Sequence, residues 1–186
     1  AVSRLEKTRH EIPLLSLDKT KSSMVLLNFM GEQQVMLMLK LDGLTVKLTY
    51  ENGELLEAAT RGDGDEGEII THNTRAISGI PSHITYKERL VVTGESFIRP
   101  SDFEELKTSL QDSSGKPYKN GRNLAAGSIR LMDAKTCQER RLVFMPFGVL
   151  EGFPHLTRKS DKLRELRALG FQPCKYLVTK QKLTLE

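Results

Sequence analysis

The pattern that decides the fold lies in residues 35–60, which read VMLMLKLDGLTVKLTYENGELLEAAT. Residues 35–41 form an apolar run, which predicts a buried strand. Along residues 44–50, apolar and polar side chains alternate with the period of a strand that has one exposed face. Asn52-Gly53 tolerates the positive φ angles of a tight turn, so residues 54–60 are predicted to return as the partner strand. This stretch therefore predicts an antiparallel hairpin that follows a further strand.

The remaining elements are predicted on both sides of this hairpin. A glycine-rich acidic loop follows it at residues 61–67, and a short strand lies after residue 171. Longer strands are predicted at residues 88–98 and 142–150, and helices at 22–34, 101–111, 123–132 and 160–169. We expect Ser101 and Glu104 to form a capping box at the start of the second helix. Hairpins combined with isolated helices favour an α+β fold, with antiparallel or mixed β-sheets flanked by helices, over a doubly wound sheet.

Composition narrows the class of protein without deciding its function. The chain has 186 residues, of which 38% are hydrophobic and 28% are charged, as in an ordinary globular domain. It carries no apolar run that could cross a bilayer and no signal-peptide pattern, so we expect a cytoplasmic protein with no membrane partner. The formal net charge of +4 suits an anionic partner but does not require one. Two distant cysteines and four scattered histidines indicate neither a zinc site nor a disulfide framework.

The segment Lys40-Leu41-Asp42-Gly43 carries the strongest chemical signal. A lysine at the end of an apolar strand is partly desolvated, which favours the neutral, nucleophilic amine. Gly43 leaves room for a bulky ligand close to the backbone. Four residues with this pattern also occur by chance, and an ordinary turn lysine is the alternative interpretation of the motif taken alone.

Five further segments accompany this motif in a fixed order across residues 10–150. They are HEIPLLSLD at 10–18, AATRGDG at 58–64, GE at 94–95, RNLAAGSIR at 122–130 and FGV at 147–149. With them, the chain resembles the adenylation domain of bacterial-type NAD-dependent DNA ligases, a nucleotidyltransferase core of the DNA ligase and mRNA capping enzyme type. The TRGDG and RNLAAGSIR segments favour the NAD-dependent branch of that superfamily over the ATP-dependent ligases and capping enzymes.

The resemblance implies a reaction in three steps. Lys40 attacks the α-phosphorus of NAD and retains AMP as a covalent lysyl-AMP. The AMP then passes to the 5′-phosphate of nicked double-stranded DNA, and the 3′-hydroxyl seals the strand. Negative charge builds on phosphate oxygens in each step, so we expect cations around the site and a Mg²⁺ ion held mostly by phosphates and water, with no metal site built from side chains. The expected partners are NAD or AMP, nicked DNA and the remaining domains of a ligase.

The same resemblance assigns roles near the nucleophile. Asp42 would orient or charge-balance Lys40, although a structural aspartate of the turn is an equal alternative. Leu41 and Arg61 would contact the nucleotide, with a loop ion pair as the alternative for the arginine. Glu95 would meet a ribose hydroxyl or a metal-bound water, and in any role a carboxylate within an apolar strand requires a partner.

More distant residues complete the predicted site. Ser16 and Leu17 would line the adenine pocket, mainly through backbone groups. Phe147 would stack on adenine, although an aromatic ring in a core strand more often serves packing alone. Arg122 and Arg130 would face phosphates of NAD or of the nick, because guanidinium groups bind phosphates in a bidentate manner. A pairing on the helix surface is the alternative for Arg130.

Several positions depart from the family pattern. Met38 stands where the family has a glutamate near adenine, and Phe147 replaces a tyrosine and so lacks its hydroxyl. Three further replacements are Thr93 for an arginine, Ile69 for an acidic residue and Gly121 for a proline. The NMN-binding subdomain and the later lysine motifs of the family are not found in the sequence. Residues 1–186 are therefore predicted to be an incomplete adenylation domain that reacts poorly with NAD when alone.

Other functions remain open on the sequence alone. The first is an ATP-dependent ligase or a capping-type nucleotidyltransferase, which shares the lysine motif. The second is a catalytically silent nucleic-acid-binding module derived from a ligase. A third is a small-molecule-binding domain without a nucleic-acid role, against which only the resemblance of residues 122–130 argues.

Overall fold

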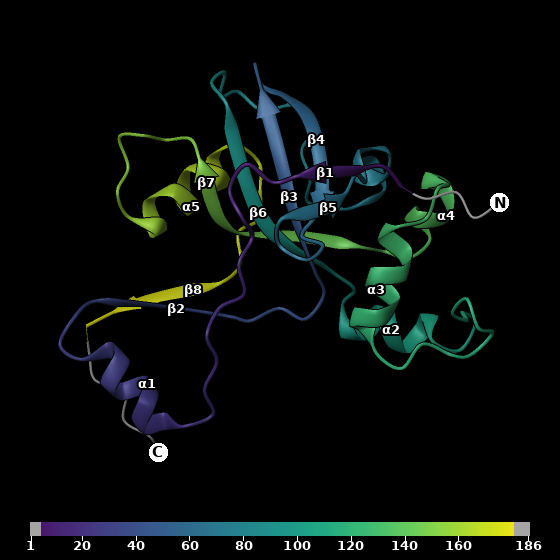
Figure 1. Cartoon of the computed structure of the whole chain (residues 1–186), viewed down its shortest axis with the longest axis horizontal. Helices are drawn as coiled ribbons and strands as arrows, with labels where there is room; N and C mark the ends of the chain where they lie inside the picture. Colours follow the sequence, from purple (N-terminus) through teal and green to yellow (C-terminus); the bar gives the residue numbers. More distant parts are fainter. Residues whose placement is uncertain (1–4, 181–186) are drawn as a thin grey trace.

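A four-stranded antiparallel sheet forms the centre of the computed structural model, which describes residues 5–180 (Figure 1). Its strands run in the order β4-β3-β6-β7, with bounds β3 (Leu44–Glu51), β4 (Glu54–Thr60), β6 (Leu90–Phe97) and β7 (Val143–Glu151). Asn52 and Gly53 join β3 to β4 with φ angles of 53° and 84°. The predicted hairpin is therefore confirmed, together with the two later strands.

One face of the central sheet carries the hydrophobic core. Val46, Leu48 and Tyr50 on β3 are fully buried there. The ring of Tyr50 meets that of Phe171 edge-on, with 5.8 Å between centroids. The helices that surround the sheet are α2 (Pro100–Leu106), α3 (Gly121–Ile129), α4 (Ala134–Gln138) and α5 (Lys159–Ala168). Each large apolar side chain buried in this way contributes about 1.5–3 kcal/mol.

The opposite face of the sheet is polar, and the N-terminal segment covers part of it. There β1 (Lys7–Arg9) pairs with β5 (Glu66–Glu68), which begins inside the loop predicted at residues 61–67. Beneath this cover Lys47 of β3 is buried and lies 3.4 Å from a carboxylate oxygen of Glu57. The predicted exposed face of β3 is therefore wrong at Lys47 and at Thr49, which are both buried, because the N-terminal segment lies beside them.

Another two-stranded sheet lies to one side of the central sheet. It consists of β2 (Val35–Met38) and β8 (Tyr176–Thr179), and α1 (Ser23–Met30) lies beside it at the edge of the molecule (Figure 1). All residues of β2 are only half-buried, and Leu39 is 60% exposed. The predicted strand at residues 35–41 is confirmed only for Val35–Met38, and its predicted burial is wrong, because in residues 5–180 it belongs to a small sheet separate from the central one.

The helix boundaries correct several expectations. The capping box of Ser101 and Glu104 is not formed, since α2 begins at Pro100 and its N-cap residue, Arg99, makes no side-chain cap. The helix α3 begins two residues before the predicted position, because the Asn120 side chain accepts a hydrogen bond from the Asn123 N–H. Neither α4 nor the 3₁₀ helix η1 (Thr71–Ala76) was predicted. The class is α+β with antiparallel sheets, and no helix of the described part is long and apolar enough to span a membrane.

Candidate functional site

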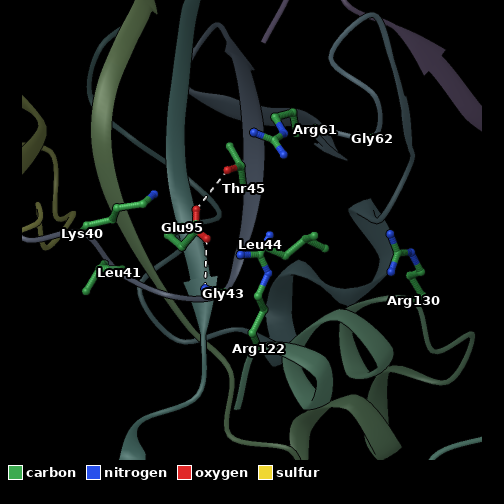
Figure 2. A pocket seen from close by; sticks show the side chains of 10 residues that line it. All are labelled: Lys40, Leu41, Gly43, Leu44, Thr45, Arg61, Gly62, Glu95, Arg122 and Arg130. Carbon is green, nitrogen blue, oxygen red and sulfur yellow. Dashed lines mark hydrogen bonds between the residues drawn. The ribbon is translucent and has the colours of Figure 1, made fainter. Parts of the chain in front are cut away.

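Lys40 lies in the loop between β2 and β3, beside a cavity of about 110 Å³ (Figure 2). It is exposed and follows the end of β2 at Met38 by two residues, so it does not stand at the end of a buried strand as the sequence predicted. Leu41 lines the cavity next to it. The other residues that line it come from four further parts of the chain: Gly43, Leu44 and Thr45 at the start of β3, Arg61 and Gly62 after β4, Glu95 on β6, and Arg122 and Arg130 at the two ends of α3. The fold thus brings most of the predicted site residues to one place from positions up to 90 residues apart.

Glu95 is the best-anchored side chain of this cavity. Its carboxylate accepts hydrogen bonds of 3.0 Å from the Gly43 N–H and of 3.0 Å from the Thr45 hydroxyl (Figure 2). Burial raises the pKa of Glu95, whereas these two hydrogen bonds and the charges of Lys40 and Arg122 oppose that rise. The partner that a buried carboxylate requires is therefore present.

Gly43 and Thr45 hold the loop between β2 and β3, called the Lys40 loop here, against the central sheet. Thr45 pairs with Glu95 in the register of β3 and β6, and sequence reasoning did not single it out. A Cβ atom on Gly43 would lie 2.1 Å from the Ser96 carbonyl oxygen, so the glycine lets the loop approach β6 closely. Gly43 was expected to leave room for a ligand, and the structure adds the close approach of a neighbouring strand.

Asp42 has a partner other than the lysine. Its carboxylate lies 3.4 Å from the Arg122 guanidinium, and the two side chains are 75% and 55% exposed. An ion pair this open to solvent contributes little to stability. Its geometric effect is to hold Arg122, in the first turn of α3, near the Lys40 loop. The predicted pairing of Asp42 with Lys40 stays a prediction.

The other two arginines are held at different points around the cavity. Arg61 donates to the Ser16 hydroxyl at 3.5 Å, and its backbone N–H donates to the Thr45 carbonyl at 2.9 Å. Arg130 forms an ion pair with Glu68 and donates to the Ala126 carbonyl at 3.1 Å. The alternative of an ion pair for Arg130 is therefore realised, although its partner lies on β5 rather than on the helix. Three arginines and one lysine line the cavity, with Glu95 as the carboxylate among the lining residues, so the cavity suits a multiply charged anion such as a phosphate chain.

Four predicted residues do not line the cavity: Asp42, described above, and three residues expected at the adenine base. Ser16 is exposed and reaches the site only through its contact with Arg61. Leu17 is 91% exposed. Phe147 is half-buried in an irregular part of β7, where the register against β6 shifts between Thr93 and Gly94. Their roles at the adenine base stay predictions.

Sequence comparison decides the family. A sequence model of the NAD-dependent DNA ligase adenylation domain matches residues 2–184, which is nearly the whole chain. The chain belongs to the NAD-dependent DNA ligase adenylation domain family. This membership confirms the resemblance of the six motifs and excludes the interpretation as an ATP-dependent ligase or a capping enzyme.

Curated relatives of this adenylation domain agree with the family. The chain is 46% identical to a DNA ligase of Ruminiclostridium cellulolyticum over 81% of its length, and 39% identical to one of Lachnoclostridium phytofermentans over 91%. It is also 42% identical to a DNA ligase of Campylobacter fetus over 71% of its length. The matched region spans 23%, 26% and 20% of these relatives, so the adenylation domain corresponds to about a quarter of each.

Proposed function

We propose that this adenylation domain forms a covalent lysyl-AMP from NAD, with Lys40 as the nucleophile. The Lys40 amine attacks the α-phosphorus, a phosphorus–nitrogen bond forms, and the bond from that phosphorus to the bridging oxygen breaks. Nicotinamide mononucleotide leaves with the bridging oxygen, and the amine loses a proton. The observation that supports this proposal is the position of Lys40 beside a cavity that it shares with Glu95 and cationic side chains.

The charges around the cavity suit this step. Negative charge accumulates on the phosphate oxygens as the bond to nitrogen forms, and preorganised cations stabilise it. Arg122 and Arg130 flank the cavity from the two ends of α3 and would bind phosphates of NAD or of the nick. Arg61 would contact the nucleotide from the opposite side, and Glu95 would accept a hydrogen bond from a ribose hydroxyl.

The contacts with adenine and the role of Asp42 belong to the same proposal. Asp42 would hold Arg122 in place by the ion pair already described. Ser16, Leu17 and Phe147 would contact the base once a nucleotide enters, with the Phe147 ring as the stacking surface. Leu41 would pack against the nucleotide beside the nucleophile.

Magnesium would reach this site mainly through the substrate. Within residues 5–180, no three His, Cys, Asp or Glu side chains gather in a group that could bind a metal ion. The donors around the cavity are mostly cationic, and Glu95 is the carboxylate among them. This set fits an ion that keeps its waters and binds phosphate oxygens, as Mg²⁺ commonly does, and such an ion would neutralise phosphate charge.

We further propose that the adenylate serves the sealing of nicked double-stranded DNA in the cytoplasm, together with the other domains of a ligase. The AMP would pass from Lys40 to the 5′-phosphate at the nick. Attack by the 3′-hydroxyl would then join the strand and release AMP. Membership of the family and the cationic cavity support this proposal.

Intact-mass analysis tests the nucleophile directly. The chain is incubated with NAD and Mg²⁺, and we expect a slow gain of one AMP that is absent in Lys40→Ala and in Lys40→Arg. A parallel incubation with ATP should give no adduct, and an adduct from ATP alone would contradict the proposed cofactor. Salt-dependent binding of nicked DNA without any adduct from NAD would instead favour a catalytically silent DNA-binding module.

A further inference from the structure

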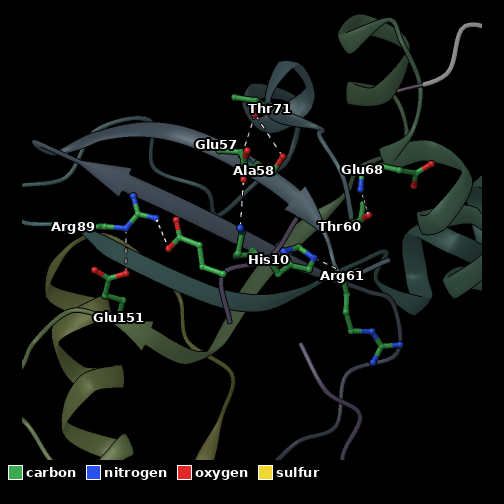
Figure 3. Close-up of polar contacts among 11 residues, drawn as sticks. His10, Glu57, Ala58, Thr60, Arg61, Glu68, Thr71, Arg89 and Glu151 are labelled. Carbon is green, nitrogen blue, oxygen red and sulfur yellow. Dashed lines mark hydrogen bonds and ion pairs between the residues drawn. The ribbon is translucent and has the colours of Figure 1, made fainter. Parts of the chain in front are cut away.

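His10 is a buried side chain that contacts the backbone of a site residue. It is only 5% exposed, and its Nε2 atom lies 3.1 Å from the carbonyl oxygen of Arg61 (Figure 3). A carbonyl oxygen only accepts, so Nε2 carries the proton and donates. The other ring nitrogen, Nδ1, is buried without a hydrogen-bond partner among residues 5–180. The buried ring thus directs one specific hydrogen bond to Arg61.

The peptide groups of Arg61 are fixed from two sides. The Arg61 N–H donates to the Thr45 carbonyl of β3 at 2.9 Å, and the Arg61 carbonyl also accepts from the Gly64 N–H at 3.1 Å. Gly62 follows with a φ of 59°, so the chain turns immediately after Arg61. Without His10, the tight turn alone would hold this carbonyl. The direction of the Arg61 side chain depends on the orientation of these two peptide groups.

His10 is itself held firmly against the loop that it supports. Its backbone N–H donates to the Asp65 carbonyl at 2.8 Å, and the Leu14 N–H donates to the Gly64 carbonyl at 2.8 Å. Gly67 lies so close to the ring that a Cβ atom there would be 2.9 Å from His10 Nε2. The ring therefore has little freedom to leave the Arg61 carbonyl.

We propose that His10 is a positioning residue for nucleotide binding, which acts through the Arg61 backbone and has no contact with the nucleotide itself. The N-terminal segment thus orients the Arg61 guanidinium, which the Ser16 hydroxyl contacts from the same segment. This inference rests on the proposed function, in which Arg61 contacts the nucleotide. It adds a residue outside the cavity to the determinants of nucleotide affinity.

A double-mutant cycle between His10 and Arg61 tests the inference, with AMP as the probe and its dissociation constant measured by NMR titration of the full chain. His10→Phe keeps the ring and removes the donor, whereas His10→Gln keeps an N–H donor. We expect His10→Phe to weaken AMP binding about three- to tenfold, the contribution of one hydrogen bond. His10→Gln should recover part of this loss. In an Arg61→Met background, His10→Phe should add almost nothing, because coupled residues are not additive.

Other outcomes separate the inference from the proposed function. If Arg61→Met weakens AMP binding and His10→Phe does not, the positioning role is wrong and the proposed function stands. Equal losses from His10→Phe in both backgrounds would indicate a general structural effect and would also overturn the inference. If AMP does not bind and Lys40 gains no AMP from NAD, the proposed function itself fails. Far-UV circular dichroism verifies folding, and His10→Leu replaces His10→Phe in the same cycle if the latter does not fold.

Discussion

Replacing Gly43 by alanine should separate the Lys40 loop from the central sheet. The added Cβ atom would lie 2.1 Å from the Ser96 carbonyl oxygen and 2.8 Å from the Cβ atom of Phe97. The Ser96 contact is more than an ångström shorter than an ordinary van der Waals contact. Because this neighbour is backbone, the clash cannot be relieved by a change of rotamer. The start of β3 must move away from β6.

The loss in the free energy of unfolding follows from the contacts that this movement disrupts. Overpacking in a close-packed region costs about 1–3 kcal/mol. The Gly43 N–H also loses its 3.0 Å hydrogen bond to Glu95, and each such bond contributes about 1 kcal/mol. We therefore expect Gly43→Ala to lower the free energy of unfolding by about 2–4 kcal/mol, a large part of the roughly 5–15 kcal/mol typical of a folded domain. Formation of lysyl-AMP should fall as well.

Urea unfolding followed by far-UV circular dichroism measures this change. With a slope of about 2 kcal/mol per molar urea, the midpoint should fall by about 1–2 M. Gly121→Ala is the matched control, because its Cβ atom would be 3.7 Å from the nearest atom, the Ile98 carbonyl oxygen, and alanine favours a helix. The control should unfold at or slightly above the wild-type midpoint. A Gly43→Ala midpoint equal to that of the wild type would refute the reasoning.

Two further predictions concern buried ionisable groups. Burial raises the pKa of Glu95, so the folded protein bears a cost at neutral pH for keeping this carboxylate charged. Glu95→Gln should therefore raise the urea midpoint at neutral pH, although it should lower lysyl-AMP formation. This gain in stability should shrink as the pH falls through the raised pKa of Glu95, and it should vanish below about pH 4. A gain in stability that does not depend on pH would contradict burial of the charge as its cause. Burial raises the pKa of the Cys137 thiol to about 11. In a Cys174→Ser background, a thiol reagent at neutral pH should label Cys137 much faster in urea than in the folded protein, and rapid labelling of the folded protein would show that the thiol is accessible.

The central hairpin was predictable because its signals are local. The alternation of side chains in β3 and the turn at Asn52 and Gly53 depend on neighbouring residues only. The strand β4 accordingly has the predicted bounds, Glu54–Thr60. The motif around Lys40 is equally local, but its interpretation as a nucleophile depended on five further segments spread over residues 10–150.

Partners that are distant in sequence could not be predicted. The apolar run that contains β2 indicated burial, but the depth of burial depends on what packs against the faces of its sheet, and β8, its partner strand in residues 5–180, lies about 140 residues later. The contact of Asp42 with Arg122, 80 residues away, was also not foreseen, whereas its predicted role toward its near neighbour Lys40 stays a prediction. Charge and spacing do not distinguish such partners, because both choices place opposite charges within reach.

The pair Gly94-Glu95 shows how one short motif serves both faces of a sheet. Successive residues of a strand point to opposite faces, so these two residues have different neighbours. On the core face, a Cβ atom at position 94 would lie 2.4 Å from the Phe144 ring, which leaves room only for glycine. On the polar face, Glu95 lies opposite Thr45 and anchors the start of β3. The close packing of β6 against Phe144 fixes the position from which Glu95 reaches the Lys40 loop. The geometry of the site therefore depends on the packing of the core. A larger residue at position 94 should therefore impair lysyl-AMP formation even though it faces away from the cavity.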